Sequence, residues 1–137
     1  MNKKFVVAWI VAFIVWMAGD FAVHGAWLAP RYAALAALYR PEADQMQYLA
    51  WMIAAHALMA GGAAWIYARG VTAAAWTGQG FRFGLALAVL YGPMYLIYYS
   101  VQPLPRTLVA MQGLGCGVVM IVVGMALGFV HKGAAKA

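Results

Sequence analysis

The chain has 137 residues, of which 67% are hydrophobic and only 9% are charged. Soluble domains are about 45–50% apolar and about 25% charged, so this composition excludes a soluble globular protein. It also excludes a disordered chain, because disordered chains contain few apolar and aromatic residues. The single cysteine excludes a disulfide framework and any zinc site that needs two thiolates. The composition therefore predicts a small integral membrane protein.

The formal net charge is +6, from nine Lys and Arg residues against three Asp and Glu residues. In a soluble protein such a charge would indicate a nucleic-acid partner. Here the basic residues are scattered at the ends of apolar segments and form no basic stripe. Membrane topology and lipid headgroups explain this distribution, and we expect no nucleic-acid partner.

Four apolar segments are long enough to cross a bilayer, since about 20 apolar residues span a hydrocarbon core of about 30 Å. They cover residues 5–28, 48–68, 83–99 and 108–130. They predict an all-α integral membrane protein, a bundle of four transmembrane helices in a single domain, 1–137. The first segment is predicted to be a transmembrane helix and not a signal peptide, because Asp20 and His24 occupy the place of a small-residue cleavage site.

Lys and Arg residues in the short loops predict the orientation. The side that holds both termini and the middle loop has six basic residues and no acid: Lys3, Lys4, Arg69, Arg82, Lys132 and Lys136. The other side has three basic residues and two acids: Arg31, Arg40, Arg106, Glu42 and Asp44. We therefore expect both termini in the cytoplasm.

Two local features are predicted outside this simple pattern. The first connection carries Leu35, Leu38 and Tyr39 on one helical face, which predicts a short interfacial helix on the outer surface, ended by Pro41. The third segment contains Gly92 followed by Pro93, which has no N–H to donate. We expect the helix to be interrupted there.

Glycines predict how the helices pack. Lipid tails are as apolar as Leu, so helices in a bilayer associate through close contact of small residues. The fourth segment carries two G-x-x-x-G pairs, Gly113 with Gly117 and Gly124 with Gly128. We expect these glycines to pack the bundle, with self-association or docking on a larger complex as the alternative.

Three ionisable side chains lie inside the predicted spans, where such groups are costly and mark candidate functional sites. Asp20 and His24 are four residues apart and share one helical face, and His56 lies on the second span. Asp20 and His56 both lie about 12 Å below the outer boundary at about 1.5 Å per residue, so they can meet if the two spans are neighbours. Four further polar side chains of similar depth complete a predicted pocket in the outer half of the bilayer: Tyr91, Tyr95, Gln112 and Cys116.

The residues of this pocket leave several functions open. An Asp–His pair can simply hold two helices together. Asp20, His24 and His56 can form a three-ligand metal site, since imidazole suits zinc, copper and iron. His24 and His56 can be axial haem ligands, but their depths differ by roughly 6–8 Å. Asp20 and His56 can also form part of a proton or small-solute path.

No motif of a known catalytic chemistry occurs in the sequence: there is no Ser–His–Asp arrangement, paired carboxylate, Walker loop or dinucleotide fingerprint. The sequence argues against an enzyme and requires no cofactor, although a metal ion or haem is compatible with it. The first expectation is an accessory or assembly subunit of other membrane proteins, or a homo-oligomer. The alternative is a transporter or binding protein for a metal ion, a proton or a small solute, and a haem or metal redox protein is the third.

Several segments resemble an uncharacterised family of small four-span bacterial membrane proteins. They are Asp20-Phe-x-x-His24-Gly25, Tyr39-Arg40-Pro41, His56, Trp65-Ile-Tyr-Ala-Arg-Gly70, Gly80-Phe-Arg-Phe-Gly84 and the Tyr-Tyr-x-x-Gln-Pro segment that ends at Pro103. The resemblance covers most of the chain. It implies a four-helix protein of the bacterial inner membrane and implies no activity.

Overall fold

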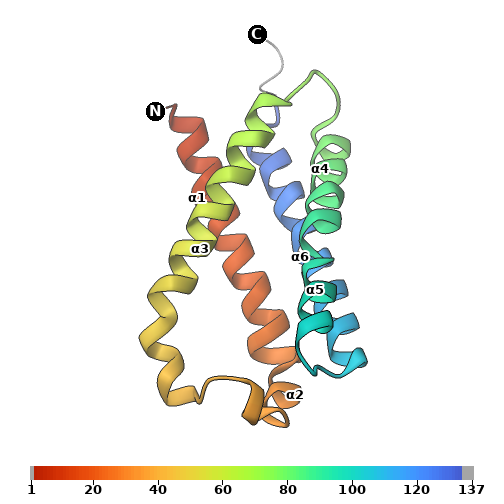
Figure 1. Cartoon of the computed structure of the whole chain (residues 1–137). Helices are drawn as coiled ribbons and strands as arrows, with labels where there is room; N and C mark the ends of the chain where they lie inside the picture. Colours follow the sequence, from red (N-terminus) through yellow and green to blue (C-terminus); the bar gives the residue numbers. More distant parts are fainter. Residues whose placement is uncertain (1, 134–137) are drawn as a thin grey trace.

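A computed structural model of the chain describes residues 2–133, and every regular element in that range is helical (Figure 1). The elements are α1 (Lys3–Asp20), the π-helix η1 (Phe21–Trp27), α2 (Ala29–Ala33), the 3₁₀ turn η2 (Ala36–Leu38), α3 (Glu42–Arg69), α4 (Trp76–Tyr91), α5 (Met94–Val101) and α6 (Arg106–Val130). They form four helical spans that are long and apolar enough to cross a membrane: Lys3–Trp27, Ala43–Arg69, Trp76–Val101 and Arg106–Val130. The chain is therefore an all-helical, multi-pass membrane protein, as its composition predicts.

The helices pack in the order α3, α1, α6, α4. α1 packs on both α3 and α6, and the most extensive contact is between α4 and α6. Figure 1 shows the start of α1, the end of α6 and the α3–α4 loop at one end of the bundle, which we call the termini end. α2 and the α5–α6 turn lie at the other end, which we call the opposite end. Outward-facing Leu58 and Leu114 are 75% and 73% exposed, as expected for side chains that contact lipid.

The observed spans differ from the predicted segments mainly at their ends. α3 begins at Glu42 and not near residue 48, because a helix can continue past the apolar core that the hydropathy pattern detects. α4 begins at Trp76 and not near residue 83. Its first turn is held by Gln79, whose Oε1 accepts from the Thr72 N–H at 2.9 Å while its Nε2 donates to the Ala74 carbonyl at 2.6 Å.

The sequence predicts an interruption of the third span and a short helix in the first connection, and the structure agrees with these two predictions to different degrees. The third span breaks between α4 and α5 at Gly92 and Pro93, which confirms the predicted interruption. The first connection is helical only in the short elements α2 and η2, and not as one helix from Arg31 to Arg40. Its Tyr32 packs against the bundle, where its ring stacks on His24 with ring centroids 5.9 Å apart.

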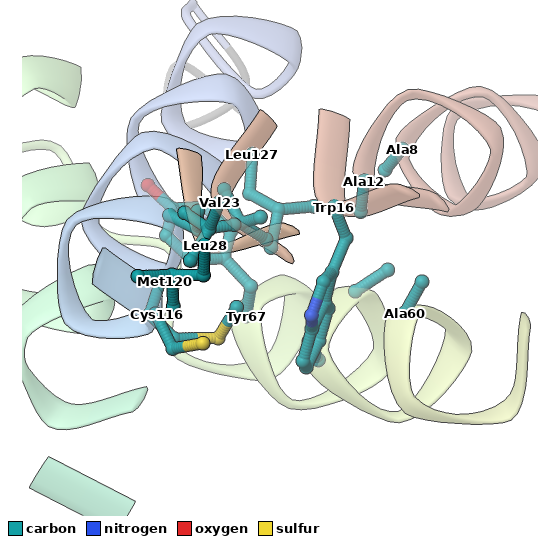
Figure 2. Close-up of a cluster of buried hydrophobic side chains, with 14 of the residues drawn as sticks. Ala8, Ala12, Trp16, Val23, Leu28, Ala60, Tyr67, Cys116, Met120 and Leu127 are labelled. Atoms are coloured by element: carbon teal, nitrogen blue, oxygen red, sulfur yellow. The ribbon is translucent and has the colours of Figure 1, made fainter. Parts of the chain in front are cut away.

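The buried core lies on both sides of α1 (Figure 2). Toward α3, Ala8 and Ala12 are fully buried and allow the two helices to approach closely. Trp9 reinforces this contact, because its Nε1 donates to the Ala57 carbonyl oxygen at 2.7 Å. Toward α6, the core contains the fully buried Met120 and Leu127. α1 is therefore the central helix that joins α3 to the α4–α6 pair.

α4 and α6 meet through their backbones. A Cβ placed on Gly84 would lie 2.6 Å from Ile121 Cα, and one on Gly80 would lie 2.8 Å from the Gly124 carbonyl oxygen. Real Cβ atoms essentially never approach other atoms below 3.0 Å, so these positions require glycine at the observed helix separation. The contact gives this helix pair the close packing that replaces hydrophobic burial in a membrane.

The four glycines of the two G-x-x-x-G pairs are not equivalent. Gly128 has the Trp76 carbonyl oxygen 2.7 Å from its hypothetical Cβ, and Gly124 has the Gly80 carbonyl oxygen at 2.5 Å. A Cβ on Gly113 or Gly117 would instead meet its nearest neighbour at 3.7 or 3.8 Å, an ordinary contact distance. Gly124 and Gly128 thus form the tight part of the interface.

Candidate metal centre

The polar side chains of the spans gather where α1 passes into η1. Asp20 is the last residue of α1, and His24 lies in η1. The hydrogen bond that defines the π-helical turn runs from the Leu28 N–H to the carbonyl oxygen of Val23, five residues earlier, at an N···O distance of 2.9 Å. π-helical segments inside α-helices are rare and frequently lie at functional sites. His24 lies within this segment, and its Nε2 faces Cys116 of α6.

Asp20 joins α1 to α3 through His56. The His56 Nε2 lies 2.9 Å from Asp20 Oδ2, and its Nδ1 lies 2.8 Å from the Met52 carbonyl oxygen. A carbonyl oxygen only accepts, so the His56 Nδ1 donates there. The Nε2–Oδ2 contact then holds one further proton, either on an imidazolium that faces the Asp20 carboxylate or on a protonated Asp20 that donates to a neutral imidazole. In both forms the pair has no net charge, which lowers its cost in a bilayer.

His24 lies at the centre of a second group of contacts. Its Nε2 is 3.2 Å from Cys116 Sγ on α6 and 3.2 Å from the Tyr95 hydroxyl oxygen on α5. The Tyr95 hydroxyl is in turn 3.0 Å from Cys116 Sγ. The nitrogen, the sulfur and the phenol oxygen thus form a nearly equilateral triangle contributed by three helices. Ligand atoms of Asp20, His24 and Cys116 all lie within 4.8 Å of one another. We call Asp20, His24, Tyr95 and Cys116 together the His24 cluster.

The other ring nitrogen of His24 is controlled by a relay of two side chains. Its Nδ1 is 2.5 Å from the Tyr32 hydroxyl oxygen, and Gln112 Nε2 lies 3.0 Å from the same oxygen. Burial raises the pKa of Tyr32 to about 12, so its hydroxyl keeps its proton at neutral pH. In the structure Gln112 Nε2 donates to the Tyr32 hydroxyl, which is then free to donate to His24 Nδ1. If the Gln112 amide is turned, the hydroxyl donates to the amide oxygen and accepts from a protonated Nδ1. The Nε2 then has a free lone pair that faces Cys116.

Three buried polar atoms have no hydrogen-bond partner among the described residues: Asp20 Oδ1, Gln112 Oε1 and Trp16 Nε1. Leaving such groups unpaired is costly, so each one needs a physical reason. Turning the Gln112 amide gives its oxygen Tyr32 as a partner but leaves the amide nitrogen in the position that has none. The unpartnered Asp20 oxygen belongs to the carboxylate whose other oxygen faces His56, and Asp20 also lies beside His24 and Cys116. A ligand could therefore bind this oxygen without displacing a hydrogen bond.

The structure brings together all seven residues predicted for the polar pocket, but it groups them differently. Asp20 and His56 meet directly, while His24, Tyr95 and Cys116 form the triangle beside them and Gln112 supports it through Tyr32. Tyr91 contributes its ring, which packs edge-on against Trp16 and against Tyr95 at centroid distances of 5.6 and 6.3 Å. The sequence predicts a metal site of Asp20, His24 and His56. In the structure the third residue whose ligand atom lies close to those of Asp20 and His24 is Cys116.

Two residues of the site do not follow from the sequence pattern. Tyr32 lies in the first connection, for which the sequence predicts an interfacial helix, yet its hydroxyl contacts His24 Nδ1. Trp16 is only 4% exposed, and it packs edge-on against both His56 and Tyr91. Its position four residues before Asp20, on the same helical face, is the signal that indicates this placement.

The donor set and its dimensions suit a transition-metal ion. An imidazole nitrogen, a thiolate and a carboxylate oxygen are all ordinary zinc ligands, with Zn–N near 2.0–2.1 Å and Zn–S near 2.3 Å. At a tetrahedral angle these lengths separate nitrogen and sulfur by about 3.6 Å. The observed separation of 3.2 Å needs an expansion of only a few tenths of an ångström. Tyr95 offers a fourth donor atom on the same triangle.

The geometry is less suited to a haem shared by His24 and His56. All four ring nitrogens of the two histidines already face protein groups: Tyr32 and Cys116 for His24, and Met52 and Asp20 for His56. A shared haem would require both rings to leave these partners.

Comparison with known proteins adds no further assignment. No protein-family model, curated protein or solved structure gives a match to this chain. The functional argument therefore depends on the geometry of the site.

Proposed function

We propose that this membrane protein binds one transition-metal ion of the zinc type in the His24 cluster. Asp20, His24 and Cys116 supply oxygen, nitrogen and sulfur ligands, and the Tyr95 hydroxyl lies beside them. The observation that carries the proposal is the combination of three ligand atoms within 4.8 Å with a buried, unpartnered Asp20 oxygen. A structural polar network would be expected to pair that oxygen, whereas a metal site uses it.

The residues around the ligands support the same function. A metal-bound histidine normally donates its second ring N–H to a neighbouring group, which fixes the tautomer. The Tyr32–Gln112 relay can accept that proton from His24 Nδ1. A metal-bound carboxylate is likewise held by a hydrogen bond, and His56 supplies it to Asp20. The roles of His56, Tyr32 and Gln112 are therefore to position ligands.

A metal-binding titration of the purified protein tests the proposal. After removal of metal with a chelator, wild-type protein should bind one Zn²⁺ per chain. Cys116→Ala and His24→Ala should lose that stoichiometric binding. His131→Ala is the matched control, because His131 is also buried but lies at the termini end and its Nδ1 bonds the Leu127 carbonyl at 2.9 Å. Unchanged binding in both ligand variants, or equal loss in the control, would refute the proposal.

We propose in addition that the protein lies in a bacterial inner membrane with the termini end in the cytoplasm. Figure 1 supports one part of this orientation, since the α3–α4 loop lies at the same end as the start of α1 and the end of α6. Of the six basic residues counted for that side, Lys136 lies outside the described residues. A role as an accessory subunit or homo-oligomer, and an interfacial position of α2 and η2, stay predictions. Reporter fusions at the two termini and native mass spectrometry test the orientation and the self-association respectively.

A further inference from the structure

A pocket at the termini end lies outside the His24 cluster. It has a volume of about 320 Å³ and opens between α3 and α4, beneath the loop that joins them. Ile66, Tyr67, Gly70, Thr72, Gln79, Arg82 and Phe83 line it. A neighbouring cavity of about 310 Å³ shares Tyr67, Thr72 and Gln79 with it and is also lined by His131 and Lys132. The two cavities adjoin and form one recess at the end of the bundle.

The recess has a positive lining and free hydrogen-bond donors. Arg82 has no hydrogen-bond or ion-pair partner within residues 2–133. The three acidic residues of the chain are Asp20, Glu42 and Asp44, and all of them belong to elements at the opposite end or in the middle of the bundle. Tyr67 is only 6% exposed, and its hydroxyl has no partner among the described residues. An anion in the pocket would therefore meet a guanidinium and at least one hydroxyl donor.

Other contacts among the described residues hold the walls of the recess in place and leave the Arg82 guanidinium and the Tyr67 hydroxyl free. Gln79 closes the loop through its bonds to Thr72 and Ala74. The Tyr67 ring packs edge-on against Phe83 at 5.1 Å and against His131 at 5.3 Å. These ring contacts hold the Tyr67 hydroxyl in place, and the Arg82 guanidinium lies in the lining of the same pocket.

We propose that this recess binds the phosphate of an anionic phospholipid headgroup. Arg82 pairs with the phosphate, since guanidinium is the side chain best matched to phosphate oxygens, and Tyr67 donates a hydrogen bond. The pocket lies at the ends of two spans, Ala43–Arg69 and Trp76–Val101, which is the depth of lipid headgroups. Ile66, which lines the pocket, is 54% exposed and offers an apolar surface to an acyl chain. Basic pockets between helices at this depth are typical headgroup sites.

Native mass spectrometry of the full-length protein, with phosphatidylglycerol and phosphatidylcholine of equal chain length, tests this proposal. Wild-type protein should retain phosphatidylglycerol in preference to phosphatidylcholine. Arg82→Gln should weaken that retention about tenfold, as expected for loss of a charge-assisted bond. Arg69→Gln is the matched control, because Arg69 lies at the same end but places its guanidinium over the Trp65 ring, 3.6 Å from the ring centroid.

Tyr67→Phe provides a second variant, since it removes only the hydroxyl and keeps the ring contacts that support the fold. It should weaken retention of phosphatidylglycerol several-fold without changing the elution volume of the protein. Equal retention of the two lipids by wild type, or an equal effect of Arg82→Gln and Arg69→Gln, would overturn the proposal. Displacement of the lipid by millimolar inorganic phosphate would also overturn it, because the ligand would then be a soluble phosphate.

Discussion

The α4–α6 interface allows a sharp comparison between two Gly→Ala substitutions on one helix. A Cβ on Gly124 would lie 2.5 Å from both the Gly80 carbonyl oxygen and Gly84 Cα, whereas a Cβ on Gly117 would lie 3.8 Å from Ala88 Cβ. Both neighbours of Gly124 are backbone atoms, so no side-chain rotation relieves the contact. The helices must separate by about 1 Å to restore ordinary carbon–carbon contact at about 3.5–4.0 Å.

The magnitude follows from two opposing effects. Overpacking costs about 1–3 kcal/mol, and a gap of 0.5–1 Å also loses roughly a quarter to a half of each neighbouring dispersion contact. Replacing Gly by Ala inside a helix regains about 1 kcal/mol of helix propensity. Gly124→Ala should therefore destabilise the bundle by about 2 kcal/mol, while Gly117→Ala should be neutral or stabilising by up to about 1 kcal/mol.

Unfolding in mixed micelles, with tryptophan fluorescence recorded against the mole fraction of denaturing detergent, measures both free energies. The free energies of unfolding of the two variants should differ by about 2–3 kcal/mol, with Gly124→Ala the less stable. Equal stability of Gly124→Ala and Gly117→Ala would refute the backbone-contact account of this interface. Both substitutions add the same methyl group to the same helix, so their difference reports the contact alone.

Three further predictions concern α1 and its partners. Trp9→Phe removes the bond from the indole to the Ala57 carbonyl and should lower the free energy of unfolding by about 1 kcal/mol in the same detergent assay. His56→Leu keeps the side-chain volume but removes the bond to Asp20. It should lower the free energy of unfolding by about 1 kcal/mol and leave metal binding at one ion per chain. Loss of that stoichiometric binding would instead make His56 a ligand. Tyr32→Phe breaks the relay to His24 and should weaken metal affinity about 10–100-fold in a competition titration while the fold is retained; an unchanged affinity would contradict its positioning role.

Depth along the helices predicts that Asp20 and His56 can meet if their spans are neighbours. In the structure α1 packs on α3, and the two side chains are 2.9 Å apart. The break at Pro93 also follows from local chemistry, since proline lacks the N–H that the helix needs. Each of these features depends on the type of one residue and on its position along a span, and both can be read from the sequence.

Other parts of the site depend on how one helix is rotated against another. The π-helix η1 adjusts the face on which His24 lies, and no apolar periodicity marks it. Tyr32 reaches the site only because the first connection turns back into the bundle. Its depth along the fourth span places Cys116 in the predicted polar pocket. Its contact with His24 additionally requires α1 to pack on α6, as it does in the structure.

Cobalt(II) substitution tests the central claim most directly, because the charge-transfer absorption of a cobalt thiolate appears only when sulfur binds the ion. Wild-type protein loaded with one Co²⁺ should show this band, and the band should disappear in Cys116→Ala while it persists in His131→Ala. Addition of Zn²⁺ should abolish it by competition for the same site. A wild-type protein that binds no Co²⁺, or binds it without the thiolate band, would contradict the assignment of Asp20, His24 and Cys116 as a metal centre.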